Sequence, residues 1–326
     1  MIDATFAQSL IESEDVLDVI FQEMLSIATP ESYPDDLLAH YENTEEALNA
    51  LECFLYDAFY ESYDELLERC QERSQQDAAK VSANLFDRCQ LVLIADALSL
   101  REAALLKVWM ENEPEIEIKD VSFLPAPFPA ITETLSIQLL GTISPAQGSN
   151  TEFFSYQYVA GVAQTPTLPK TGNLLIWLRL PDILLEKVTM AQNNTVADAF
   201  EKARDKIKSL FLTSGRDELL ITSDHGYLYG RSANQIMPMQ TALLTACRRV
   251  FPHSKRYQAM TVENEARIKP YEWREPERRA FVFTDTHIVL RSRYWWGTES
   301  PNDRCVAHGG LSFVEGLVPM LHLRRK

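Results

Sequence analysis

Three short, nearly unbroken apolar segments constrain the fold of this 326-residue chain more than any other feature of its sequence. They cover residues 90–95, 174–178 and 219–222, and an aspartate follows soon after each of them. Runs of this length and character are typical of strands that are buried on both faces of a parallel sheet. Segments with helical spacing of apolar residues lie between or after them, at 98–108, 196–211 and 241–250. The alternation predicts an α/β domain with a mostly parallel sheet and helices on both faces.

The first 88 residues have a different character, because they contain no such strand-like run and show helical periodicity instead. One helix is predicted from Ser13, with an apolar face and a solvated acidic face. A second helix is predicted to begin at Thr44 as its capping residue and to continue to Leu67, and a third covers 76–85. We therefore expect an acidic all-α module over residues 1–88, followed by the α/β domain over residues 89–326.

Charge is distributed unevenly along the chain. The net charge is -16, yet residues 226–326 carry 16 basic and 9 acidic side chains, whereas residues 1–95 carry 4 basic and 21 acidic ones. An overall charge of this sign repels nucleic acid, so any contact with a polyanion must be local. The contrast between the two ends is typical of separate modules, or of one module that shields another.

Membrane and secretory classes are not expected. No apolar run approaches the ~18 residues of a membrane helix, and the first residues lack the basic and apolar regions of a signal peptide. The five cysteines are spread widely without a CxxC pair, which favours reduced thiols over disulfides or a structural zinc site. These features predict a cytoplasmic protein.

The aspartates that follow the apolar runs are Asp96, Asp182 and Asp224, and His225 comes directly after the last of them. Ligands of a parallel sheet bind beyond the carboxyl ends of its strands, so these side chains are expected at one edge. Carboxylates that crowd together at low dielectric repel each other and need a cation to remain ionised side by side. The pattern therefore predicts a divalent-metal site.

The same stretches resemble the two-metal motifs of the alkaline phosphatase superfamily. The matching segments are Ser-Asp-His-Gly at 223–226, Pro-Asp-Ile-Leu-Leu-Glu at 181–186 and His-Gly-Gly-Leu-Ser-Phe at 308–313, and they continue to Pro319. The last segment and residues 93–98 are especially similar to the PglZ domain, which is known from phage-exclusion systems and from some response regulators. The resemblance covers roughly residues 89–326 and leaves the N-terminal helices unassigned.

This resemblance implies a ligand set of two groups. Asp96, Asp224 and His225 would hold one divalent ion, and Asp182 and His308 would hold the second. We expect Zn or Mn as the ions, with Mg as an alternative.

The resemblance also implies a nucleophile. In phosphodiesterase relatives it is a threonine three residues after a proline, and the stretch Phe-Pro-Ala-Ile-Thr at 128–132 makes it Thr132, with Thr134 as the alternative. Independently of the resemblance, residues 132–140 are predicted to form a helix that Gly141 ends. A hydroxyl at a helix N-terminus sees a partial positive charge, and a divalent ion lowers its pKa further.

One position departs from the family pattern. Relatives carry Asp-x-x-x-His where this chain has Asp182 followed by Glu186, so a carboxylate replaces the usual imidazole. Glu186 lies one helical turn beyond Asp182 on the same face and is predicted to remain a ligand. A site of two carboxylates and His308 favours Mn or Mg over Zn. The alternative is that Glu186 is a solvated residue in a site that has lost one ion.

The function predicted first is a metal-dependent phosphoester hydrolase, and more narrowly a phosphodiesterase that acts on nucleotides or oligonucleotides through Thr132. The basic residues after position 226 suit a substrate with several phosphates. Arginines interleaved with aromatics at 291–296 are typical either of a strand end or of a single-strand binding surface.

Two alternatives stay open. One is a degenerate PglZ-like scaffold or regulatory subunit of a defence or signalling complex, which binds a protein partner through the acidic helices. The other is that these helices mimic nucleic acid and cover the basic region.

Overall fold

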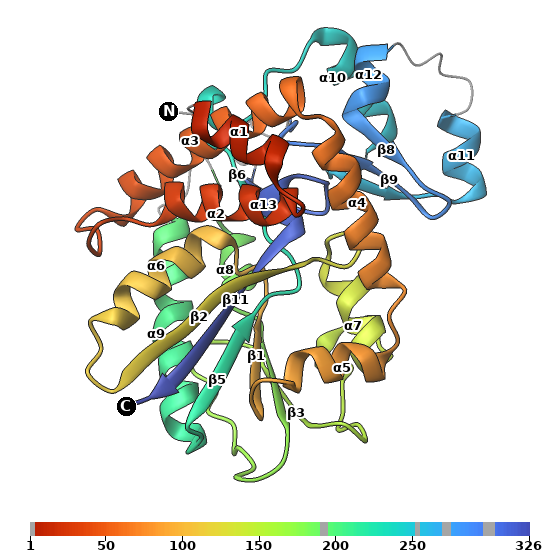
Figure 1. Ribbon diagram of the computed structural model, residues 1–326. Helices are drawn as coiled ribbons and strands as arrows, with labels where there is room; N and C mark the ends of the chain where they lie inside the picture. The colour runs from red at the N-terminus through yellow and green to blue at the C-terminus, as the bar shows by residue number, and fades with distance from the viewer. Residues whose placement is uncertain (1–3, 190–194, 252–254, 269–274, 296–303) are drawn as a thin grey trace.

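The computed structural model describes residues 4–189, 195–251, 255–268, 275–295 and 304–326 (Figure 1). The helices before the first strand are α1 (Ala4–Glu12), α2 (Val16–Ala28), α3 (Leu37–Ala58), α4 (Glu61–Ser74) and α5 (Ala78–Phe86). The later helices are α6 (Leu100–Glu111), α7 (Thr132–Leu140), α8 (Asp182–Leu185), α9 (Val196–Ser214), α10 (Thr241–Val250), α11 (Val262–Ile268), α12 (Glu275–Ala280) and α13 (Phe313–Gly316).

A six-stranded sheet forms the centre of the molecule. Its strands, in spatial order, are β2 (Ile116–Pro125), β11 (Leu317–Arg325), β5 (Glu218–Thr222), β1 (Leu91–Ala95), β4 (Leu174–Leu178) and β3 (Ser155–Val159). Only β11 runs against its neighbours, because it pairs antiparallel with both β2 and β5, while β1 pairs parallel with β4 and β5. The predicted mostly parallel sheet is confirmed, and β1, β4 and β5 are its three central apolar runs.

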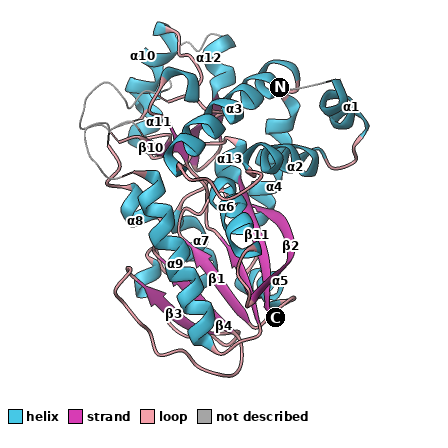
Figure 2. Cartoon of the chain, turned by 90° about the vertical axis from the view of Figure 1, so that its left-hand side faces the viewer, coloured by secondary structure: helices cyan, strands magenta, loops and turns pink. Residues whose placement is uncertain are grey.

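Helices cover both faces of this sheet, as predicted (Figure 1, Figure 2). Side chains of a strand alternate between faces, so Leu91 and Leu93 of β1 pack in one core together with α6 and α9. Val92 and Ile94 pack in another core against α5 and α7. Because both faces of β1 and β4 are covered, these strands need apolar residues at every position.

Two small sheets complete the C-terminal half. β6 (Leu228–Tyr229) pairs with β10 (Val306–Ala307), and the order β7-β9-β8 joins β7 (Tyr257–Ala259), β9 (His287–Leu290) and β8 (Phe281–Phe283). Figure 1 shows β8, β9 and helices α10 to α12 grouped to one side above the main sheet. Within the described ranges, no helix is both long enough and apolar enough to cross a bilayer.

The N-terminal helices α1 to α4 lie over the carboxyl ends of the parallel strands (Figure 1). Their apolar side chains share one core with Leu100 of α6 and with Phe313, Val314 and Leu317 near the C-terminus. The domain boundary at residue 88 stays a prediction. The shared core means that helices α1 to α4 pack directly against the α/β part of the chain.

Buried ion pairs cross the same contact. Glu45 of α3 pairs with Arg101 of α6 and with Arg293, and Glu52 of α3 lies 3.9 Å from Arg293. The four side chains are at most 1% exposed. Charges in such a place need a partner, since an ionised group alone in the interior is strongly destabilising.

Helix boundaries test the sequence predictions most closely. The helix at 132–140 and the end at Gly141, which has φ +69°, are confirmed. The prediction that Thr44 begins the second helix is wrong. Asp36 caps α3 by accepting a hydrogen bond from the Ala39 amide, and Thr44 is buried within the helix. The predicted helix to Leu67 is also divided, because α3 ends at Ala58 and α4 begins at Glu61.

Candidate metal centre

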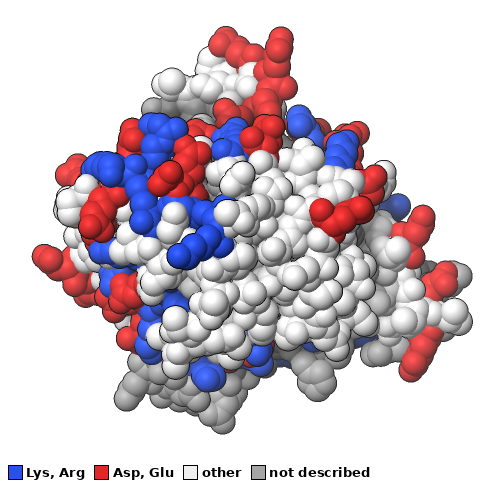
Figure 3. Space-filling model, turned by 90° about the horizontal axis from the view of Figure 1, so that it is seen from below, with Lys and Arg blue, Asp and Glu red and all other residues white. Residues whose placement is uncertain are grey.

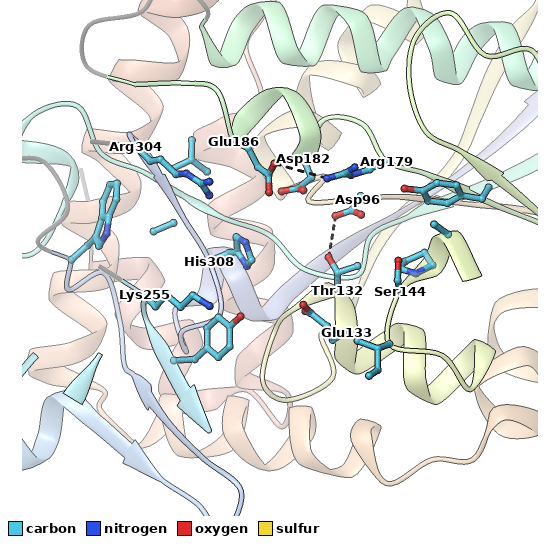
Figure 4. A pocket seen from close by; sticks show the side chains of 18 residues that line it. Asp96, Thr132, Glu133, Ser144, Arg179, Asp182, Glu186, Lys255, Arg304 and His308 are labelled. Atoms are coloured by element: carbon cyan, nitrogen blue, oxygen red, sulfur yellow. Dashed lines mark hydrogen bonds and ion pairs between the residues drawn. The ribbon is translucent and has the colours of Figure 1, made fainter. Parts of the chain in front are cut away.

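The predicted site residues are brought together at the carboxyl end of the sheet. Asp96 directly follows β1, Asp182 opens α8 after β4, and Asp224 and His225 follow β5. Thr132 is the first residue of α7 in the segment after β2. These strands point the same way, so their following residues meet at one edge, as Figure 4 shows for Asp96, Asp182 and Thr132.

Asp224 is fully buried and held by three donors on one oxygen. The amides of Ala97 and His225 each donate to Oδ1 over 3.0 Å, and the Ser223 hydroxyl donates to it over 3.3 Å. The other oxygen, Oδ2, is buried without a hydrogen-bond partner among the described residues. A carboxylate oriented in this way has one oxygen committed to the fold and one free for a cation.

His225 presents one ring nitrogen to the same point. Its Nδ1 lies 2.9 Å from the carbonyl oxygen of Gly226, an acceptor, so Nδ1 carries the proton and Nε2 keeps its lone pair. Nε2 lies 3.2 Å from Thr132 Oγ1 and 3.6 Å from Asp224 Oδ2. This tautomer is the one that a metal ligand requires.

Gly226 makes this arrangement compact. A Cβ at Gly226 would lie 1.9 Å from the carbonyl oxygen of Val314, so only glycine lets the loop between β5 and β6 pass this close to α13.

Asp96 completes the group. Its Oδ1 accepts a hydrogen bond from the Thr132 hydroxyl over 3.2 Å, and its Oδ2 accepts one from Trp177 Nε1 over 3.3 Å. Burial, followed by the charges of Asp224 and Asp182, raises the pKa of Asp96 well above its ordinary value. Crowded carboxylates with raised pKa values indicate a place where a bound cation would offset their mutual repulsion.

The donor set fits a divalent ion. One ligand atom each from Asp96, Asp224 and His225 lie within 4.8 Å of one another, and these residues are buried. The unpartnered Asp224 Oδ2 belongs to this cluster. Two carboxylates and one imidazole suit Zn, Mn and Mg to different degrees, so the geometry leaves the choice of ion open.

The residues predicted for a second ion lie beside the first group. The ring of His308 stacks on that of His225, with centroids 4.3 Å apart, and its Nδ1 is buried without a partner among the described residues. The Asp182 amide donates to the Asp96 carbonyl over 3.1 Å, so the two loops are tied together. Only Asp96, Asp224 and His225 form a ligand cluster among the described residues, so the role of Asp182 and His308 as ligands of a second ion stays a prediction.

Glu186 stands apart from the other candidates. It lines the cavity, but its side chain is 42% exposed and its carboxylate lies 3.9 Å from the Arg179 guanidinium (Figure 4). The side chain thus has an ionic partner other than a metal. Its role as a ligand stays a prediction.

A cavity of about 670 Å³ opens above these groups. It is large enough for a nucleotide-sized ligand. Its walls come from the ends of β1 and β4, from residues 143–146 after α7, and from the C-terminal half. The residues that line it and that carry charge are Asp96, Glu133, Arg179, Asp182, Glu186, Lys255 and Arg304.

Sequence reasoning missed several of these residues. Trp177 is inside β4, and nothing in an apolar run distinguishes the member that donates to Asp96. Lys255 and Arg304 lie outside every motif. Arg179 carried a positional signal, because it follows a buried strand just before Asp182. The excess of basic residues after position 226 indicated the region of Lys255 and Arg304, but not these two side chains.

The arginines at 291 and 293 are paired with carboxylates of the N-terminal helices. Arg293 is buried in the ion pairs with α3, and Arg291 pairs with Asp64 of α4 over 2.8 Å. Trp295 lines the cavity, and Trp296 lies outside the described residues. The interpretation of Arg291 and Arg293 as nucleic-acid contacts is therefore wrong, because both face the N-terminal helices.

The acidic groups predict a pH dependence of the metal-free chain. Burial raises the pKa of Asp182 to about 6, above the ~3.9 of an unfolded aspartate. Between these values the folded chain binds a proton that the unfolded chain does not, so the free energy of unfolding falls as pH rises through this window. We expect the metal-free chain to melt at a higher temperature at about pH 4.5 than at about pH 6.5, relative to Asp182→Asn. Melting curves in EDTA test this, and a constant difference between the two proteins would contradict it.

Comparisons with known proteins find structural likeness only. No protein-family model matches the sequence, and no curated protein matches it. A phosphonoacetate hydrolase from Sinorhizobium meliloti, in complex with phosphonoformate, is 11% identical over 72% of this chain and 89% of that one, with a TM-score of 0.37. Murine ectonucleotide pyrophosphatase/phosphodiesterase 5 is 15% identical over 48% of each chain, with a TM-score of 0.25. An inactive variant of the murine protein in complex with AMP is 14% identical, also with a TM-score of 0.25. At these scores the likeness carries no functional argument.

Proposed function

We propose that this chain is a divalent-metal-dependent phosphoester hydrolase of the alkaline phosphatase superfamily, and that it acts as a phosphodiesterase on nucleotides or oligonucleotides. The narrower PglZ assignment rests on sequence motifs alone, chiefly residues 93–98 and 308–319. The observation that carries the proposal is the buried cluster of Asp96, Asp224 and His225 beside the Thr132 hydroxyl. A hydroxyl next to a cation site at the mouth of a cavity is the arrangement that phosphoryl transfer to a side chain needs.

Each residue has a defined task in this proposal. Asp96, Asp224 and His225 hold the ion nearest Thr132, and Asp182 and His308 hold the second, with Glu186 as a further ligand. The ions supply positive charge that favours an ionised hydroxyl and offsets the negative charge of the phosphoryl group.

Thr132 is the proposed nucleophile. Its Oγ1 gives up its proton to solvent and attacks the phosphorus in line, the phosphorus–oxygen bond to the leaving alcohol breaks, and the leaving oxygen takes a proton from water. Water then hydrolyses the phosphothreonine, which restores the Thr132 hydroxyl and releases a phosphomonoester. The hydroxyl sits at the first position of α7, where the helix dipole also favours negative charge. Its hydrogen bond to Asp96 Oδ1 and its 3.2 Å contact with His225 Nε2 restrict its rotamer before substrate arrives.

The test is metal-dependent hydrolysis of bis(4-nitrophenyl) phosphate by the full chain. We expect activity with added Mn or Zn, no activity in EDTA, and two equivalents of metal per chain by elemental analysis. Asp224→Asn should lower the rate at least about a hundredfold, because it removes the charge of a buried ligand. The same variant should raise the melting temperature of the metal-free chain, since it relieves repulsion with Asp96.

A suitable control is Asp217→Asn. Asp217 directly precedes β5, at the opposite end of that strand from Asp224. The substitution should leave the rate within about twofold of wild type, as expected for a residue remote from the site. Full activity of Asp224→Asn with unchanged metal content would refute the proposed centre.

A second candidate, a degenerate scaffold, is favoured by one observation. Glu186 replaces the expected imidazole and pairs with Arg179, as expected of a residue at a position that no longer binds a metal ion. A well-folded chain that binds no Mn or Zn and hydrolyses no phosphodiester would select this candidate over the enzyme.

A further inference from the structure

We propose that Lys255 and Arg304 form a second anion site in the cavity, which binds a second phosphate group of the ligand. This inference rests on the proposed function, because it takes the first phosphate to bind at the Thr132 end. It narrows the ligand class to molecules with two phosphate groups.

Charge is distributed unevenly along the cavity. Asp96 and Asp182 lie beside Thr132 together with Arg179, Glu186 lies between Asp182 and Arg304, and Lys255 and Arg304 lie beyond His308 (Figure 4). Cations bound by the carboxylates would hold the first phosphate at one end. A molecule that extends past His308 then meets two further positive charges.

These two side chains have no carboxylate partner among the residues that the structure describes, although the chain as a whole is strongly acidic. Arg179, by contrast, is paired with Glu186. Lys255 and Arg304 are both exposed, and the Lys255 ammonium lies over the ring of Tyr257, with the ring centroid 5.3 Å away. Cations without a carboxylate partner at a cavity wall are available to an anionic ligand.

The two residues that follow Lys255 are fixed relative to the loop that carries His308. Gly309 has φ +91°, and a Cβ there would lie 2.3 Å from Tyr257 Cδ1, so the loop after His308 rests directly on the ring of Tyr257. The neighbouring Arg256 is fixed as well, because it donates to Glu315 Oε1 and Oε2 over 3.0 and 2.8 Å. A site on such a support is largely preformed.

Arg304 is anchored from a different segment. Its backbone forms a bridge with Thr189, and the next amide, of Cys305, donates to the Val188 carbonyl over 3.0 Å. The chain then continues through β10 to His308. Consistent with this arrangement, burial lowers the pKa of His308, and the charges of His225, Arg304 and Lys255 lower it further.

The remaining wall suits the part of a ligand that joins two phosphates. Tyr257 and Trp295 line the cavity together with Val306 and Ala307. Aromatic and aliphatic side chains of this kind pack against a sugar or a base without requiring hydrogen bonds.

A second basic cavity, at the amino end of the parallel strands, lacks these properties. Its Arg324 pairs with Glu218 over 2.6 Å, its Arg88 pairs with Asp120 over 2.7 Å, and its Arg216 donates to the carbonyl of Gly172 over 2.8 Å. Figure 3, which views the molecule from this side, shows Lys and Arg interspersed with Asp and Glu. Its cations serve as a matched control.

The experiment is calorimetric binding with the full chain in saturating Mn²⁺, which requires no hydrolysis. The ligands are thymidine 5′-monophosphate, thymidine 5′-diphosphate and thymidine 3′,5′-bisphosphate. We expect one of the two-phosphate ligands to bind about tenfold or more tightly than the monophosphate. Tighter binding of the diphosphate would mean that the second site takes the other phosphate of a pyrophosphate group. Tighter binding of the bisphosphate would mean that it takes the next phosphate along a nucleic-acid strand.

Variants test whether Lys255 and Arg304 cause the preference for two-phosphate ligands. Lys255→Ala combined with Arg304→Ala should abolish the preference, and Lys255→Arg should retain it. Lys170 lines the second cavity together with Arg88. Arg88→Ala combined with Lys170→Ala therefore removes the same charge at the far end of the sheet and should leave the preference unchanged. Equal binding of all three ligands by wild type, or a preference that survives the first double variant, would overturn the inference. If the chain hydrolyses the phosphodiester but binds the three ligands equally, the second anion site is refuted and the proposed function stands. If the chain prefers a two-phosphate ligand but hydrolyses no phosphodiester, only the proposed activity is refuted.

Discussion

Replacing Thr132 by alanine should lower the rate of bis(4-nitrophenyl) phosphate hydrolysis at least about ten-thousandfold, the scale of loss when a nucleophile is removed. The reason is that the hydroxyl would form the bond to phosphorus, and it is placed for this by its hydrogen bond to Asp96 Oδ1 and its 3.2 Å contact with His225 Nε2. Bound metal should stay at the wild-type level, because the ligand side chains are untouched. Rates under saturating metal, together with elemental analysis, provide the measurement.

Thr134→Ala is the matched control. Thr134 lies in the same turn of α7, but its hydroxyl donates to the Pro129 carbonyl over 2.9 Å and so is committed to the backbone. We expect its rate to stay within about threefold of wild type, as for a substitution away from the reacting groups. If instead Thr134→Ala is inactive and Thr132→Ala is active, the alternative nucleophile of the sequence analysis is the correct one.

Replacing Arg293 by methionine should destabilise the chain by about 3–5 kcal/mol, because it leaves buried carboxylates without their counter-charge. Arg293 pairs with Glu45 and lies 3.9 Å from Glu52, and these three side chains are fully buried. Glu52 already has its pKa raised by burial, with Arg293 acting in the opposite direction. Chemical denaturation, monitored by tryptophan fluorescence, measures the free energy of unfolding.

Arg291→Met provides the comparison two residues away. The partner of Arg291 is Asp64, whose side chain is 58% exposed, so water solvates that carboxylate when the arginine is removed. We expect a loss of about 1 kcal/mol, the range for pairs with a solvated member. Equal losses in the two variants would mean that the buried network does not hold the N-terminal helices to the domain.

These ion pairs bear on the idea that the acidic helices cover a basic region by mimicking nucleic acid. Glu45 and Glu52 bind arginines of the α/β domain inside the core rather than across an open face. A cover that a partner lifts away would leave Arg101 and Arg293 without counter-charges in an apolar environment. The contact is therefore better described as part of the fold.

The part of the site that sequence could predict is the part that local rules control. An apolar run such as 90–95 identifies a buried strand, and a parallel sheet brings the residue after each strand to one edge, so the pattern predicts Asp96 beside Asp224. The start of α7 at Thr132 followed from a helix-forming stretch that ends in glycine. Helix caps were less certain, because Thr44 resembles a cap but lies inside α3.

The sequence by itself determined the α/β alternation and the meeting of three aspartates, since both depend on periodicity within about ten residues. The tertiary structure alone decided which charges are paired. Arg293 and Glu45 are 248 residues apart, and the cations Lys255 and Arg304 reach the cavity from segments without a motif. Periodicity records which face of its own element a side chain takes, whereas burial and pairing depend on what packs against that face, and distant segments supply those contacts only in the folded chain.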